Sequence, residues 1–148
     1  MTILAAIGDD DADERVVSTA YDLARTYDDR LLAVHAISVE DFEAHERTME
    51  QSPHIEDFSI EDERENAADL AREAVTDTLE SFDEDRVEFV GRVGDSAEEV
   101  TAAVAEHDPR YLVVGGKRRS PVGKAIFGST TQSLLLSVDC PVVTVMVE

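Results

Sequence analysis

The sequence predicts an α/β fold in which five parallel strands form one sheet with helices on both faces. Short continuous apolar runs alternate along the chain with longer amphipathic stretches, as expected for β-α units around a sheet that is covered on both sides. A length of 148 residues suits one domain, and neither an internal repeat nor a Gly/Ser linker divides the chain. We therefore expect a single domain over residues 1–148.

The apolar runs are the expected strands, and the amphipathic stretches between them are the expected helices. The strands are Thr2–Ile7, Leu31–Ile37, Val87–Val90, Tyr111–Val114 and Val142–Val147. Helices are predicted over Asp11–Tyr27, over about Ile60–Phe82, after a cap at Asp95 or Ser96, and from near Ser129. The segment Ser38–Ser59 carries no sustained period and contains Pro53, so it is predicted to be a long surface excursion.

The chain is strongly acidic, with 34 Asp and Glu against 13 Lys and Arg and a net charge of −21. This charge repels nucleic acid phosphates and anionic membranes, so we expect neither as a partner. Eleven of the basic residues are Arg, and acid is spread along the chain instead of gathered into one tail, which resembles proteins of salt-loving archaea. We therefore expect a halophilic protein; the alternative is an ordinary acidic protein.

The cysteine content and the lengths of the apolar runs narrow the possible classes of protein further. Cys140 is the single cysteine, which excludes an internal disulfide and a multi-cysteine metal site. No apolar run approaches the roughly 18 residues of a membrane span, and no basic region precedes the first apolar stretch. We expect a cytoplasmic protein without a leader segment.

The segment that follows the fourth strand is predicted to hold the functional site. Four of the 13 basic residues, including both lysines, lie between Gly115 and Thr131. Ligands of open parallel sheets bind beyond the carboxyl ends of the strands. Here a glycine pair permits close approach of the backbone to a ligand, and Gly128-Ser129-Thr130 leads into a helix that begins near Ser129. Backbone N–H groups, hydroxyls and basic side chains at one place suit an anion. The alternative is a plain turn, an ordinary helix cap and basic residues that offset acidic neighbours.

This segment matches neither a Walker A sequence nor the GxGxxG pattern. It does carry a regular spacing: two residues separate Gly115 from Arg118, nine residues separate Arg118 from Gly128, and Ser129 follows. That spacing resembles the motif of nucleotide-binding universal stress proteins, with Arg118 in place of one glycine. ILAAI, LLAVHAI, YLVVGG and DCPVVTVMV extend the resemblance along the whole chain. It implies a Rossmann-like, adenine nucleotide alpha hydrolase-like fold with three layers and strand order 3-2-1-4-5.

The resemblance also implies which residues contact a nucleotide. Near the adenine it places Ala6, Ile7, Gly8 and Ala36, and at the ribose and phosphates it places Gly115, Lys117, Arg118, Gly128, Ser129 and Thr130. The family usually has Asp where this chain has Gly8; Asp9 follows and is a candidate substitute, or a contact to Mg²⁺ or ribose. Arg118 either disfavours a glycine-type backbone conformation and weakens binding, or clamps a phosphate and strengthens it.

Three histidines could suggest a catalytic or metal site, but the sequence favours a structural or solvent-exposed role for each. His35 lies within an apolar strand, where a satisfied buried histidine is expected instead of a catalytic base. His45 and His54 belong to the acidic excursion and are expected to be solvated.

The expected function is binding of ATP or a related adenine nucleotide, with Mg²⁺ as a candidate companion ion, as a regulatory ligand in stress response. Enzymatic activity is not expected beyond a weak ATPase at most. The resemblance implies a homodimer, and the uncharged edge Val142–Val147 is its expected contact. The alternative is a nucleotide-independent dimeric interaction module with a degenerate site. The sequence does not identify protein partners.

Overall fold

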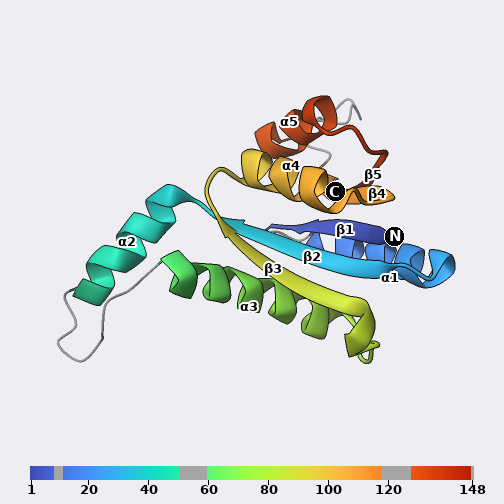
Figure 1. The fold of residues 1–148 in the computed structure, drawn as a ribbon, viewed down its shortest axis with the longest axis horizontal. Coiled ribbons are helices and arrows are strands. Elements are labelled where there is room, and N and C mark those ends of the chain that lie inside the picture. The colour runs from blue at the N-terminus through green and yellow to red at the C-terminus, as the bar shows by residue number, and fades with distance from the viewer. Residues whose placement is uncertain (9–11, 51–59, 118–127, 148) are drawn as a thin grey trace.

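The computed structural model describes residues 1–8, 12–50, 60–117 and 128–147, with only the backbone described for residues 45–50 and Lys117 (Figure 1). The strands are β1 (Thr2–Ile7), β2 (Arg30–Ile37), β3 (Val87–Val93), β4 (Tyr111–Lys117) and β5 (Val142–Val147). The helices are α1 (Asp13–Tyr27), α2 (Val39–Glu50), α3 (Ile60–Thr78), α4 (Ser96–His107) and α5 (Ser129–Ser137), with a short 3-10 turn η1 at Glu84–Arg86.

The strands form one parallel sheet in the order β3-β2-β1-β4-β5, which confirms the predicted order. β1 lies at the centre, where Ile3 pairs with Leu31 on one side and with Tyr111 on the other. All carboxyl ends therefore meet at one edge of the sheet, which we call the carboxyl edge. The opposite edge, where the strands begin, is called the amino edge.

Alternate residues of each strand enter two separate cores, one on each face of the sheet. Ile3, Leu31 and Val113 pack with residues of α1 and α3. Leu4, Leu32 and Leu112 pack on the other face with residues of α4 and α5. Figure 1 shows α4 and α5 on one side of the strands and α3 on the other. The three-layer α/β arrangement predicted from the sequence is thus observed.

The surface excursion predicted over Ser38–Ser59 contains a helix that the sequence did not predict, since α2 covers Val39–Glu50. The Ser38 hydroxyl accepts a hydrogen bond from the Asp41 N–H at 3.1 Å, and acidic residues occupy the first turn. α2 projects away from the sheet (Figure 1), so it needs no continuous apolar face. Residues 51–59 lie outside the described residues.

β3 continues to Val93, three residues beyond the predicted end at Val90. Gly91 lies in this extension and allows α3 to pack directly on the strand. A Cβ at Gly91 would stand 1.8 Å from the Arg64 carbonyl oxygen, so any other residue would force the strand and the helix apart. α3 itself ends at Thr78, short of the predicted Phe82.

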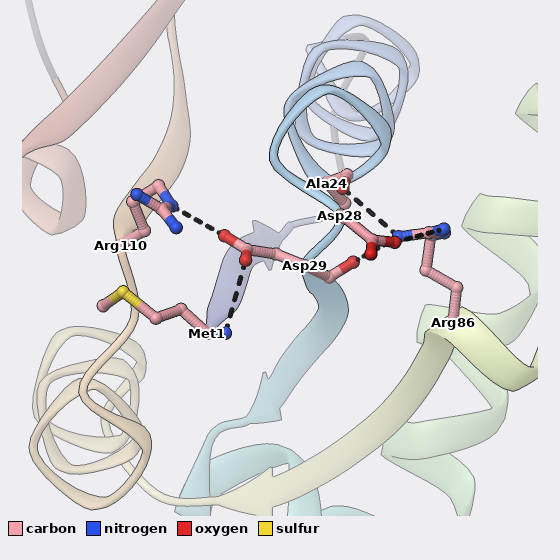
Figure 2. Close-up of polar contacts among 6 residues, drawn as sticks. All are labelled: Met1, Ala24, Asp28, Asp29, Arg86 and Arg110. Atoms are coloured by element: carbon pink, nitrogen blue, oxygen red, sulfur yellow. Dashed lines mark hydrogen bonds and ion pairs between the residues drawn. The ribbon is translucent and has the colours of Figure 1, made fainter.

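A buried carboxylate fastens the amino edge. Asp29 is 3% exposed, accepts a hydrogen bond from Arg110 Nε at 2.7 Å, and lies 3.3 Å from the amino group of Met1 (Figure 2). The hydrogen bond from Arg110 outweighs burial and holds the pKa of Asp29 below its ordinary value. The Arg110 guanidinium also lies over the Tyr27 ring, 4.3 Å from its centroid.

Arg86 extends this cluster to the start of β3. Its guanidinium donates to the backbone carbonyl oxygens of Asp29 at 2.9 Å and Ala24 at 3.3 Å, and to the Asp28 carboxylate at 3.1 Å. The same side chain therefore ties the end of α1 to the start of β3, as Figure 2 shows. Asp28 ends α1 in the left-handed region, at φ 54°.

Within the described parts of the chain, no helix has the length and apolar character needed to cross a bilayer. The same residues bring together no group of three or more side chains able to ligate a metal.

Candidate functional site

A cavity of about 260 Å³ opens at the carboxyl edge of the sheet, where β1 and β4 lie side by side. The chain leaves these two strands toward opposite faces, since α1 packs on one face and α5 on the other. Such a crossover point is the usual ligand site of an open parallel sheet. The cavity is lined by Ala6, Ile7, Gly8, Ala12, Asp13, His35, Ala36, Ser96, Val100, Val114, Gly115, Thr130, Thr131 and Leu134.

The structure brings six of the residues predicted to contact a nucleotide onto the wall of this cavity: Ala6, Ile7, Gly8, Ala36, Gly115 and Thr130. Gly128 and Ser129 are exposed at the start of α5 and are not on the wall. Lys117 is the last residue of β4, and the structure describes only its backbone. Asp9 and Arg118 lie outside the described residues.

Gly115 allows α1 to approach the end of β4. A Cβ at this position would lie 2.6 Å from the Ala12 Cβ and 3.4 Å from Val16 Cγ2. The sequence had suggested that the glycine pair lets the backbone approach a ligand. At Gly115, the space that a side chain would need is instead occupied by α1, and the ligand cavity begins beside this contact.

The first turn of α1 places a carboxylate in the cavity wall. The Gly8 N–H donates a hydrogen bond to Asp13 Oδ1 at 2.8 Å, which links the end of β1 to the start of α1. Asp13 and Glu14 both lie in this first turn, where negative charge suits the helix dipole. The α1 side of the cavity is therefore acidic.

The start of α5, on the other face, differs in charge. Its first turn contains no acidic residue, and its N-cap residue Gly128 has no side chain to cap the helix. The Thr131 hydroxyl donates to the Gly115 carbonyl oxygen at 2.8 Å and so holds this helix start against β4. First-turn N–H groups and the positive end of the helix dipole suit an anion here.

His35 has the structural role that the sequence predicted, although it also lines the cavity. The ring is 5% exposed, and Nδ1 lies 2.9 Å from the Ile7 carbonyl oxygen. Because a carbonyl oxygen can only accept, Nδ1 is the donor in this hydrogen bond. The ring thereby fastens the end of β2 to the end of β1.

α4 contributes Ser96 and Val100 to the wall. Of the two predicted caps, Asp95 is the one used, since its carboxylate accepts the Glu98 N–H at 3.0 Å. The chain turns into the helix at Gly94, whose φ of 149° favours glycine. Ser96 is the first residue of the helix instead of its cap, and it lines the cavity.

The sequence prediction missed eight wall residues: Ala12, Asp13, His35, Ser96, Val100, Val114, Thr131 and Leu134. Several of them begin helices that follow strands. Because helices that follow parallel strands start at the carboxyl edge, the first turns after β1 and β3 held a usable signal for Asp13 and Ser96. Val100 and Leu134 belong to second turns and read in the sequence as ordinary core positions.

Comparison with known proteins agrees with this fold. A family model described as the universal stress protein family matches residues 1–146. A universal stress protein of Mycolicibacterium smegmatis is 43% identical over 51 residues, a match that covers 34% of this chain and only 39% of that relative.

Two solved structures of universal stress proteins are similar over nearly their whole length. One, in complex with cAMP, has a TM-score of 0.62 at 16% identity and is matched over 99% of this chain and 96% of that one. The other, from Archaeoglobus fulgidus in complex with dAMP, has a TM-score of 0.58 at 18% identity, with 97% and 96% covered. At these identities the likeness shows the fold.

Proposed function

This chain belongs to the universal stress protein family, and on that premise we propose that it binds an adenine nucleotide as a regulatory ligand at the carboxyl edge. The observation that carries the proposal is the cavity between β1 and β4. One part of its wall is apolar, and another part is formed by the start of α5, whose first turn has no acidic residue. The two solved relatives that hold cAMP and dAMP support an adenine nucleotide as the ligand class.

The wall accommodates the two chemically different ends of a nucleotide. Ala6, Ile7, Ala36, Val100 and Leu134 supply apolar surface for a flat base. Thr130 and the start of α5 supply donors for phosphate oxygens, without a carboxylate in that turn to oppose them. This polarity orients the ligand with its phosphates toward α5.

We extend the proposal to ATP, with Mg²⁺ as a candidate companion and little or no hydrolysis. Its phosphate contacts would come from Lys117 and Arg118 together with Gly128, Ser129 and Thr130, and Asp9 is the candidate contact for the ion or the ribose. The Thr131 hydroxyl donates to a backbone carbonyl, so its role is to hold α5 in place and not to attack a phosphate. In this proposal the nucleotide is a signal and not a substrate.

We further propose that two copies pair through β5. Residues 128–147 carry one charged residue, Asp139, in a chain in which 32% of residues are charged. β5 ends the sheet, and Leu136 on the adjacent α5 is 80% exposed. Since each copy has a net charge of −21, association is least opposed through this uncharged surface.

The test is calorimetric titration of ATP, ADP and cAMP into the protein in molar KCl, where the screening length between surface charges is about 3 Å. Ala36→Leu would fill the base part of the cavity and is expected to weaken binding at least tenfold. Ala105→Leu, the same change at an exposed position of α4, is the matched control. Absence of binding heat for all three nucleotides would instead favour a nucleotide-independent dimeric module. Gly8, which replaces the Asp usual in the family, is the feature that favours this alternative.

A further inference from the structure

β3 forms the edge of the sheet opposite β5. The Gly94 N–H donates to the Ile37 carbonyl oxygen at 2.8 Å, so this N–H points toward β2. Because the backbone groups of successive residues in a strand alternate in direction, those of Phe89, Gly91 and Val93 point away from β2. Within the described residues, β3 pairs with β2 alone. The outward backbone groups of β3 are therefore available to a further strand.

A groove of about 350 Å³ lies beside the first half of β3, between this strand and α3. α3 packs tightly on β3 at Gly91, where a Cβ would lie 1.8 Å from the Arg64 carbonyl oxygen and 2.5 Å from the Ala68 nitrogen. The groove lies nearer the start of the strand, and its apolar part is formed by Ala68, Val87 and Phe89. It offers apolar surface next to the outward backbone groups of Phe89.

The rim of this groove is acidic. Asp69 on α3, Glu84 on η1 and Glu88 on β3 line it, and all three are exposed. Among the described residues, Arg72 is the basic member of the lining, and its guanidinium lies 4.5 Å from the centroid of the phenylalanine ring in the groove. Glu88 lies 3.5 Å from Arg30, whereas Asp69 and Glu84 have no ion-pair partner within the described part of the chain. The charge of the rim therefore favours an occupant with positive charge.

We propose that this edge binds an extended basic segment of a partner protein, which adds a strand beside β3. Strand addition of this kind draws affinity from backbone hydrogen bonds and specificity from alternate side chains. Here the outward groups of β3 supply the backbone hydrogen bonds. The apolar part of the groove receives side chains on one face of the added strand, and the acidic rim selects positive charge.

A second copy of this chain does not fit the β3 edge. It would bring an equally acidic rim to the same place, on a molecule with a net charge of −21. The two edges of the sheet therefore suit different partners, since the proposed contact at β5 is uncharged and the groove at β3 is not. The inference does not depend on the nucleotide site.

The test is fluorescence anisotropy of a dye-labelled hexapeptide in which lysine and valine alternate. It is titrated with the full chain in about 0.1 M KCl, where the screening length is about 10 Å. The peptide is expected to bind, and one with glutamate in place of lysine is not. Glu84→Lys reverses a rim charge and is expected to weaken binding at least fivefold, as is Asp69→Lys on a second element. Glu98→Lys, the same change at an exposed position of α4, is the matched control, with a change below about twofold.

Two methylated peptides separate strand addition from charge attraction alone. Methyl groups on the backbone nitrogens of the lysines or of the valines remove the donors on one side of the peptide strand and leave every charge in place. Pairing with β3 predicts that one of these peptides loses binding at least tenfold and that the other changes less than about threefold. A thermal unfolding midpoint within about 3 °C of the unmodified protein shows that each protein variant is folded.

Three results would overturn the proposal. Equal effects of the two methylated peptides would mean that no strand is added, and equal weakening by Glu84→Lys and Glu98→Lys would mean that the peptide binds elsewhere. Absence of binding by the lysine-valine peptide would mean that the acidic rim only protects the edge from pairing.

Discussion

The amino and carboxyl edges of the sheet differ in how their polar groups are used. At the amino edge, Asp29 is buried against Arg110 and the Met1 amino group, and Arg86 joins α1 to β3. At the carboxyl edge, polar groups line a cavity of about 260 Å³ between helix starts of unlike charge. Charged groups at the amino edge form contacts within the protein. Polar groups at the carboxyl edge instead offer hydrogen-bond donors and acceptors to a space that a ligand can enter.

This division explains how the fold can carry a variable site. Stability contributed at the amino edge does not depend on the residues that face the cavity, because the two sets of side chains lie at opposite ends of the same strands. The side chains at the carboxyl edge can then be chosen for a ligand. The comparison predicts that changes at one edge affect unfolding and changes at the other affect binding.

The largest expected effect is on stability, from Asp29→Ala. The change leaves Arg110 without its carboxylate and removes the partner of the Met1 amino group, so we expect a loss of about 3 kcal/mol in the free energy of unfolding. Urea unfolding measures the loss, and Asp22→Ala at an exposed position of α1 is the control, with a change below about 0.5 kcal/mol. A fall in nucleotide affinity for the folded variant would break the proposed separation of the two edges.

Gly115→Ala is expected to affect both properties, because its added Cβ would lie 2.6 Å from the Ala12 Cβ at the cavity. We expect a loss of about 2 kcal/mol in stability from the displaced α1 and a several-fold weaker binding of ATP. Gly128→Ala is the matched control for stability alone, since a Cβ there meets nothing within 4 Å and Gly128 is itself a proposed phosphate contact. Its expected cost is about 0.5 kcal/mol as a poorer helix cap. Equal losses of stability from the two changes would contradict the close packing of α1 on β4.

The smallest expected effect concerns acid stability. The hydrogen bond from Arg110 holds the pKa of Asp29 below its ordinary 3.8, so the folded state binds fewer protons than the unfolded chain. The stabilisation is therefore present above the ordinary pKa and is lost as pH falls through the lower folded value. Unfolding measured from pH 5 downward should show a shallower loss in Asp29→Asn than in the unmodified protein. Parallel curves would show that Asp29 is not a source of the acid sensitivity.

The fold was largely predictable because its signals are local and repeated. Apolar runs marked all five strands, and Asp95 and Ser129 marked helix starts within one residue. α2 escaped prediction because it projects from the body and carries few large apolar residues to mark it in the sequence. β3 was cut short at Val90 because the use of Gly91 depends on α3, a partner some 25 positions earlier in the chain.

The site was only partly predictable. The family resemblance led to Gly115 and Thr130 after the fourth strand, and also to Ala6, Ile7, Gly8 and Ala36 in the first two strands. A helix start after β1 pointed toward Asp13, but four other acidic residues lie within four positions of it, and the folded structure was needed to place Asp13 on the cavity wall. Likewise, the contact of Ala12 with Gly115 joins positions about a hundred residues apart and leaves no trace in either local sequence.

The most direct test of the nucleotide site is amide hydrogen exchange measured by mass spectrometry with and without saturating ATP. The proposed site predicts slower exchange at the end of β1, at the end of β4 and in the first turn of α5. Peptides around Asp29 and Arg86 at the amino edge should exchange at unchanged rates. No change at the carboxyl edge, or slower exchange confined to the amino edge, would contradict the proposal that the cavity between β1 and β4 holds the nucleotide.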